Sequence, residues 1–205
     1  MTSAPLQVLT HSREPFKLGP EADYSWTKHP EAGLRRHVDY ALGLHLSKRE
    51  HKILTKRNDS RSINQTDHEE TRLMPIFLNV FDQDSSSGAK TEFYSMAEWS
   101  FAGLQKRRME KWPLDFPTLS VSISNDDWNV WVAVARETEG EAESTRSDEE
   151  RVEMYLFGPL LIGSMRDSYS AIVLMANLAD LALWGTTEYK AWFEEHVLKA
   201  KLEAE

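Results

Sequence analysis

Three side chains on one predicted strand could exchange protons. Apolar residues alternate with polar or small residues over positions 37–46, which is typical of a half-buried strand. This alternation places His37, Asp39 and His45 on one face. A carboxyl group beside an imidazole supports general acid–base chemistry near neutral pH. The competing interpretation is structural: Asp39 accepts a hydrogen bond from a neighbouring strand or a tyrosine, and the histidines are ordinary surface or core residues.

A second predicted strand supplies the facing wall of this site. Residues 73–81 are nearly all apolar, which favours a central strand that is covered on both faces. Alternation places Asn79, Phe81 and Gln83 on one face of it. The sequence contains no Gly-rich phosphate loop, no His-Glu-x-x-His motif and no zinc ligand set. The residues therefore predict a site without a metal or a cofactor.

Periodicity and turn residues predict the elements that position these side chains. Residues 47–71 are polar and predict a connector with a turn at 58–60. Gly185 is expected to separate two C-terminal helices. The other expected elements are a helix over 91–108, strands over 119–124, 128–135 and 153–161, and helices over 168–184 and 187–203. This order predicts an α+β fold in which helices flank a mixed β-sheet core.

Length and composition favour one domain with two irregular segments. The 205 residues are enough for a single hydrophobic core. Residues 1–33 are rich in proline and predict an irregular N-terminal arm, followed by a single domain over residues 34–205. Residues 137–151 hold 7 acidic and 2 basic side chains, which predicts a flexible acidic insert.

Composition also bears on location and partners. The chain has no cysteine, so it has no disulfide and no thiolate nucleophile. Asn177 and Asp180 interrupt the apolar run 172–184, so we expect a buried helix and no membrane span. The N-terminus lacks a secretion signal, which favours a cytoplasmic or nuclear protein. Residues 35–61 hold 8 basic and 3 acidic side chains, but the net charge of −9 disfavours nucleic-acid binding.

Several segments of the chain resemble one known family. These segments are Val38–Leu42, Ser62–Thr66, Pro75–Val80, Met96–Trp99, Leu156–Leu160 and Ala182–Phe193. Together they are similar to the PD-(D/E)XK nuclease-like domain that is common in filamentous fungi. The resemblance covers residues 36–198 and implies a restriction-endonuclease-like core. It also implies that the family's N-terminal helical region is missing or shortened.

The resemblance assigns site positions to particular residues. Nucleases of this superfamily need an aspartate on one core strand and a Glu-x-Lys pair on the next, which hold a divalent metal and activate water. Asp39 matches the aspartate, whereas Phe81 and Gln83 stand at the glutamate and lysine positions. Ser95 stands where the family has a glutamine, four residues before Trp99. A phenyl ring cannot bind Mg²⁺, and a neutral amide cannot replace an ammonium group.

A shifted register is the alternative that would preserve nuclease chemistry. Asp82 or Asp84 would then supply the second carboxylate, and Lys90 or Lys106 would supply the ammonium group. In the expected register, the chain is a degenerate nuclease.

We therefore expect a former nuclease site that now binds or transforms a small organic molecule without a metal. The expected lining residues are Phe81, Gln83, Asn79, Tyr40, Ser95 and Trp99. Asp39 with His37 or His45 would carry isomerisation, dehydration or cyclisation in a fungal biosynthetic pathway. The alternatives are a non-catalytic module that binds protein or nucleic acid, and a residual Mg²⁺-dependent DNA nuclease. The sequence indicates no oligomeric state.

Overall fold

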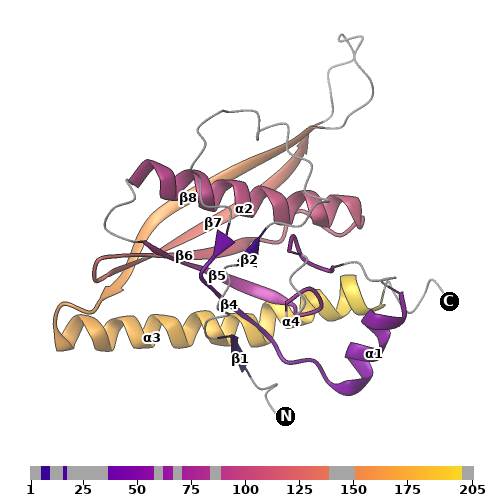
Figure 1. Ribbon diagram of the computed structural model, residues 1–205, viewed down its shortest axis with the longest axis horizontal. Coiled ribbons are helices and arrows are strands. Elements are labelled where there is room, and N and C mark those ends of the chain that lie inside the picture. Colours follow the sequence, from indigo (N-terminus) through magenta and orange to yellow (C-terminus); the bar gives the residue numbers. More distant parts are fainter. Residues whose placement is uncertain are drawn as a thin grey trace, which may run out of the picture.

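A mixed sheet of six strands lies between helices in the computed structural model, in the order β1-β4-β5-β6-β7-β8 (Figure 1). The structure describes residues 6–9, 16–17, 37–57, 62–66, 71–83, 89–138 and 151–199. The strands are β1 Leu6–Leu9, β2 Phe16–Lys17, β3 His37–Val38, β4 Tyr40–Leu44, β5 Ile76–Gln83, β6 Thr118–Ser124, β7 Asp127–Thr138 and β8 Arg151–Ser164. The helices are α1 Lys48–Arg57, α2 Ala89–Met109, α3 Ser168–Trp184 and α4 Lys190–Phe193, with π-helical segments η2 Gly185–Tyr189 and η3 Glu194–Lys199 on either side of α4.

Strand direction explains where the helices lie. Neighbouring strands of the large sheet are antiparallel except for β5 and β6, which are parallel. Parallel strands need a crossover connection, and the crossover between β5 and β6 carries α2 across one face of the sheet (Figure 1). α3 and α4 lie along the opposite face (Figure 1). The α+β prediction, with a mixed sheet between helices, is confirmed.

Two hydrophobic clusters fill the two sides of the sheet. Successive strand residues point to opposite faces, so each central strand contributes to both clusters. The α3-side cluster buries Val80, Val121 and Val130 against Tyr189 and Phe193. The α2-side cluster consists of Val38, Ala41, Met74, Phe81, Met96, Trp99 and Trp131.

The prediction of a connector over residues 47–71 was wrong for its first part, which forms α1. Ser47 and Glu50 form a capping box: Ser47 N donates to Glu50 Oε2 at 2.6 Å, and Glu50 N donates to Ser47 Oγ at 3.3 Å. Leu54 is fully buried and fixes the helix to the core. The Ser-x-x-Glu pattern was therefore the signal for this helix in the sequence.

Two stretches that were expected to be irregular contain strands. β1, within residues 1–33, pairs antiparallel with β4 and places Leu6 opposite Leu44. β7 continues to Thr138 and β8 begins at Arg151, so both ends of the expected insert 137–151 pair with each other. Residues 139–150 lie outside the described part of the chain. Hydrogen bonding between β7 and β8 thus extends further than their apolar pattern indicated.

Gly185 does not break the C-terminal helix, contrary to the prediction. Its backbone is right-handed helical, with φ −61° and ψ −38°, and the helical path continues from Ser168 to Lys199. The reason for a glycine here is close packing. A Cβ at this position would lie 2.4 Å from Cε2 of Phe77, in the α3-side cluster. The glycine therefore allows the helix to approach β5.

The prediction of a buried helix over 172–184 was also wrong. Within α3, Leu174 is buried. It packs closely on β8, because a Cβ added at Gly163 would lie only 2.5 Å from the Cβ of Leu174. Asn177 Nδ2 donates to the carbonyl oxygen of Ile162 at 2.6 Å and attaches α3 to β8. Within the described part of the chain, Ser168–Lys199 is long and apolar enough to cross a membrane by length and composition, yet only 11% of its apolar window is buried.

A carboxylate caps the first turn of α3. Asp167 Oδ1 accepts a hydrogen bond from Ser170 N at 2.9 Å, and Asp167 Oδ2 accepts one from Ser170 Oγ at 2.7 Å. These two hydrogen bonds hold the pKa of the Asp167 carboxyl below its ordinary value, and the bond from the Ser170 backbone has the larger effect.

We expect Asp167→Ala to lower the melting temperature at neutral pH, because it removes this cap. The folded-state pKa of Asp167 is lower than its unfolded value, so the cap stabilises the fold above the unfolded pKa and is lost as the pH falls through the folded pKa. The gap between wild type and variant should therefore close in acid. Thermal melts of wild type and variant against pH test this, and a gap of constant size down to acid pH would contradict it.

Candidate functional site

The structure brings Asp39 next to Phe81 on the α2 side of the sheet. β4 pairs with β5 so that Tyr40 is opposite Val80, which sets Asp39 beside Phe81. Asp39 N donates to Val80 O at 3.1 Å. Asp39 Oδ2 accepts a hydrogen bond from Asp82 N at 2.8 Å. This carboxylate therefore has the structural partner on a neighbouring strand that the competing interpretation expected.

Phe81 is packed into the core. Its side chain is 5% exposed and belongs to the α2-side cluster with Met96 and Trp99. Trp99 Nε1 donates to Asn79 Oδ1 at 3.0 Å, so the polar atom next to Phe81 is also satisfied. Ser95, one turn before Trp99 on α2, is buried as well. Apolar packing thus fills the space between β5 and α2 at this end of the sheet.

The structure does not place the other predicted site residues beside Asp39 and Phe81. Tyr40 packs against the α3-side cluster, on the opposite face of the sheet. His45 lies past the end of β4 and is exposed, after a β-bulge between Leu42 and Gly43. The side chains of His37 and Gln83 lie outside the described residues. Among the side chains that the structure describes, no three His, Cys, Asp or Glu residues form a group that could hold a metal ion.

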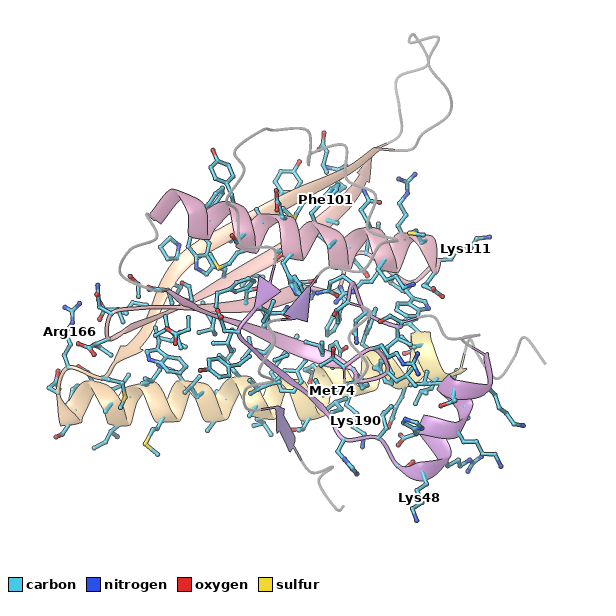
Figure 2. The ribbon with its side chains drawn as sticks, in the orientation of Figure 1. Lys48, Met74, Phe101, Lys111, Arg166 and Lys190 are labelled. Carbon is cyan, nitrogen blue, oxygen red and sulfur yellow. The ribbon has the colours of Figure 1, made fainter. Side chains whose placement is uncertain are left out.

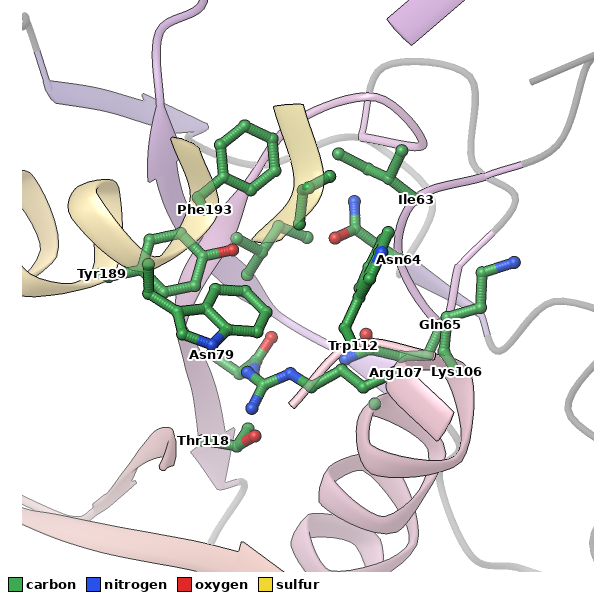
Figure 3. Close-up of a pocket in the computed structure, with 14 residues that line it drawn as sticks. Ile63, Asn64, Gln65, Asn79, Lys106, Arg107, Trp112, Thr118, Tyr189 and Phe193 are labelled. Atoms are coloured by element: carbon green, nitrogen blue, oxygen red, sulfur yellow. The ribbon is translucent and has the colours of Figure 1, made fainter. Parts of the chain in front are cut away.

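A cavity of about 40 Å³ lies at the other end of α2, where the last turns of this helix meet α4 (Figure 3). Its walls come from the loop 63–65, the starts of β5 and β6, the end of α2, and η2 with α4 and η3. Asn64 holds the loop in place, since its Nδ2 donates to Thr71 O at 2.6 Å and to Met74 O at 2.7 Å. Among the predicted site residues whose side chains the structure describes, Asn79 is the one that lines this cavity.

Two cationic residues, Lys106 and Arg107, line the cavity (Figure 3). Lys106 Nζ forms a salt bridge with Glu110 Oε1 at 3.2 Å, so Arg107 is the cation that we consider further. Its Nη1 donates to Phe116 O at 2.6 Å, and its guanidinium carbon lies 4.8 Å from the centre of the Trp192 ring. Burial lowers the pKa of Arg107 from its ordinary value, while the nearby Tyr189 and Asp115 raise it. A guanidinium remains protonated at neutral pH. Burial also raises the pKa of the Tyr189 phenol well above its usual range, so this phenol stays neutral and can donate a hydrogen bond.

Two buried polar atoms in the cavity wall have no hydrogen-bond partner in the described structure. They are Trp192 Nε1, an obligatory donor, and Thr118 Oγ1. The indole is held by aromatic neighbours: Phe116 stacks on it at 5.1 Å between ring centres, and Trp112 meets it edge-on at 6.4 Å. A buried N–H without an acceptor costs about 1–3 kcal/mol. The cavity therefore offers donors to an occupant that brings acceptor oxygens.

Sequence reasoning did not find this cavity. Basic residues at the end of a helix such as α2 complement the helix dipole, and Trp192 and Phe193 have the residue types of core packing, so neither pattern indicates a binding site. Both explanations are compatible with the structure, because the two α4 residues are buried and Arg107 lies in the last turns of α2. The residues of the cavity come from four separate segments of the chain. No local spacing in the sequence links these segments.

A mixed sheet with a crossover helix on one face and C-terminal helices on the other defines the restriction-endonuclease-like class of fold. The model of the PD-(D/E)XK nuclease superfamily matches residues 6–190. The chain therefore belongs to the PD-(D/E)XK nuclease superfamily, as the resemblance predicted. No curated protein and no solved structure matches the chain.

Proposed function

We propose that this chain is a member of the superfamily that does not cut DNA with a metal ion. The superfamily's metal needs two converging carboxylates, and the residues present do not fit it. Asp39 is engaged by the backbone of Asp82, and its neighbour Phe81 lies in an apolar cluster where a second carboxylate would be desolvated. In the register of the family resemblance, Phe81 and Gln83 replace the glutamate and the lysine.

The proposed function is binding of a small organic acid in the Arg107 cavity, with the carboxylate inside. The observation that carries this proposal is the set of unmatched donors around a protonated guanidinium. A carboxylate accepts in-plane hydrogen bonds from guanidinium and N–H groups, and such charge-assisted bonds are the strong ones. A bound cation would face Arg107, and a purely apolar group would leave the indole N–H unsatisfied.

Cavity size limits what enters. A water molecule needs ~10–15 Å³ of such volume, so the space of about 40 Å³ accepts a group the size of a carboxylate. The rest of a larger molecule would lie against the aromatic rim, where Trp112 and Phe193 line the cavity. Recognition would therefore depend on an anionic head and an apolar body.

We expect phenylacetate to stabilise the protein and phenylacetamide, its neutral analogue, to have little effect. At ten times the dissociation constant, a ligand that binds only the folded state adds about 1.4 kcal/mol. Arg107→Met should abolish the stabilisation, because the guanidinium is gone and the remaining cation of the lining, Lys106, is paired with Glu110. Trp192→Phe should weaken it, because the variant lacks the N–H that would donate to the carboxylate. The smaller ring also loses packing in the core, so the effect of the ligand is compared with the free form of the same variant. Thermal unfolding with and without each compound measures these effects.

Arg107→Lys separates charge from geometry in the same assay. Lysine retains the positive charge but lacks the planar fork, so binding should be weaker than in wild type yet stronger than in Arg107→Met. Equal stabilisation by the acid and the amide, or full retention of binding in Arg107→Met, would rule the proposed site out.

A catalytic role would use the neutral phenol of Tyr189. This donor lies in the same cavity wall as Arg107 and could polarise a carbonyl of the bound acid, as isomerase or cyclase chemistry requires. Asp39 lies outside the residues that line this cavity. Tyr189→Phe should then remove turnover and leave binding of the acid in place, whereas Asp39→Ala should affect neither.

A non-catalytic nucleic-acid-binding role is the second candidate, and the basic surface of α1 favours it. Lys48, Arg49, Lys52 and Lys56 are exposed, and Lys48 points away from the body of the molecule (Figure 2). Such a surface binds phosphates and loses affinity steeply as salt rises. If this role is real, changing these four residues to glutamine should abolish binding to a DNA duplex at low salt. Lys190→Gln, on α4, is a control that should not. Equal duplex binding by wild type and the four-residue variant would exclude α1 as the contact.

A further inference from the structure

The outer face of α3 is apolar although it is not covered by the described part of the chain. Its large side chains are strongly exposed: Tyr169 77%, Ile172 65%, Met175 70% and Leu183 60%. Ala176 and Ala179 lie between them and are also exposed. Within α3 the one charged residue is Asp180. Monomeric proteins rarely expose a contiguous apolar surface of this kind.

The spacing of this face is that of a helix–helix seam. Tyr169, Ile172, Ala176, Ala179 and Leu183 follow one another at intervals of three, four, three and four residues. This is the a/d repeat by which two helices pack along their length. We call these five residues the α3 seam.

The apolar surface ends abruptly where the helix continues. Beyond Gly185 the exposed residues include Glu188, Glu194, Glu195 and Lys199, so the outer face becomes charged. The same continuous helix thus has a solvated half and a half that is suited to burial. A face that simply tolerated apolar residues would not show this division.

We infer that the α3 seam is the contact between two copies of this chain, packed antiparallel about a two-fold axis at Ala176. In this arrangement Tyr169 of one copy meets Leu183 of the other, and Ile172 meets Ala179. Ile172 then lies against a small side chain, Tyr169 and Leu183 pack together at the two ends of the contact, and the two copies of Ala176 at the axis allow close approach. The seam is complementary to its own reverse, as a two-fold contact requires.

The available area agrees with a dimer. At on the order of 100 Å² for each of its five large exposed side chains, α3 offers roughly 500 Å² per copy. Met165, just before α3, is 58% exposed. Leu160 and Leu161 of β8 are also exposed, but successive strand residues point to opposite faces, so one of the two lies on the α3 side; with Met165 it adds roughly 200 Å². The total approaches the ~800 Å² per partner of a stable protein interface.

Two other occupants fit the residues less well. Pairing through the edge of β8 would meet Pro159, which has no N–H to donate. A membrane surface would be expected to attract basic residues beside the apolar face, but α3 contains none and the chain carries a net charge of −9.

Sedimentation equilibrium tests the inference on the full chain. Wild type should show twice the monomer mass of 23.6 kDa at micromolar concentration. Ala176→Glu should be monomeric and still folded, because it places two carboxylates at the axis without touching the core. Ala191→Glu, an identical change at an exposed position in the charged half, should remain dimeric.

Cysteine cross-linking tests the arrangement, because the chain has no cysteine of its own. Ala176→Cys should form a disulfide-linked dimer on oxidation. Ala179→Cys should not, because antiparallel packing separates its two copies by ~9 Å along the helix axis. A monomeric wild type, an Ala176→Glu variant that still dimerises, or equal cross-linking at both positions would overturn the inference. So would a wild type that is monomeric in solution and binds phosphatidylcholine vesicles through α3.

Discussion

Phe81→Glu is expected to lower the free energy of unfolding by about 3–5 kcal/mol, because it buries an uncompensated charge. The ring of Phe81 is 5% exposed and packs with Met96 and Trp99, which offer no partner to a carboxylate. The adjacent Asp39 would add repulsion between like charges. The variant restores the residue type that a nuclease would need, yet we expect no DNA cleavage. Urea denaturation measures the loss of stability, and plasmid nicking with Mg²⁺ measures the activity.

Two comparisons make this result specific to the site. Phe157→Glu is the same substitution on β8, where the side chain is 59% exposed, and it should cost less than about 1 kcal/mol. Denaturation should also be repeated with Mg²⁺. If Mg²⁺ restored most of the stability lost in Phe81→Glu, the introduced carboxylate and Asp39 would together hold the ion. The metal site would then be one substitution from complete, which contradicts the proposal that apolar packing has replaced it.

The sequence predicted the parts of the fold that depend on local periodicity. Strand alternation found β6 and β7 with the turn between them, and helical spacing found α2. The place of Asp39 beside Phe81 required only alternation and the pairing of two strands. These features are determined by residues that are close in the sequence, or by one pairing between neighbouring strands. For this reason they could be predicted.

The features that were missed depend on contacts between distant segments. Gly185 has the residue type of a helix end, but its function is determined by Phe77, more than a hundred residues earlier. The Arg107 cavity needs Trp192 and Thr118 to be placed together by the complete fold. The apolar run in α3 was interpreted as buried because the sequence alone does not show which elements cover it. Each of these features depends on packing between distant residues, which the residue pattern of one segment does not show.

The two ends of α2 differ in how their buried polar groups are satisfied. At the end near Asp39, the polar atoms of Asn79 and Trp99 satisfy each other and an apolar ring fills the remaining space. At the Arg107 end, Thr118 Oγ1 and Trp192 Nε1 are unmatched and line a cavity, whereas Ser100 Oγ and Ser120 Oγ are also unmatched but do not line it. Natural folds satisfy buried polar groups almost everywhere, so unmatched donors beside a cavity mark a place that a ligand can complete. This difference supports our proposal that the functional site lies at the Arg107 end of the helix, away from the position of the family's metal.

Gly185→Ala should destabilise the protein by about 2 kcal/mol, even though alanine is the better helix former by about 1 kcal/mol. The added methyl group would lie 2.4–2.6 Å from three atoms of the Phe77 ring, so the helix or β5 must shift. Phe77 also contacts Tyr189, with 6.0 Å between ring centres, and a shift would disturb the helix that supplies Trp192 to the cavity. Denaturation in urea measures the stability.

Gly103→Ala on α2 is the matched control: its Cβ would lie an ordinary 3.4 Å from Gln65 Oε1, so it should be neutral or stabilising. In a Phe77→Leu background the cost of Gly185→Ala should fall, because the smaller side chain leaves room for the methyl group. An unchanged cost in that background would show that the glycine is needed for some reason other than contact with this ring.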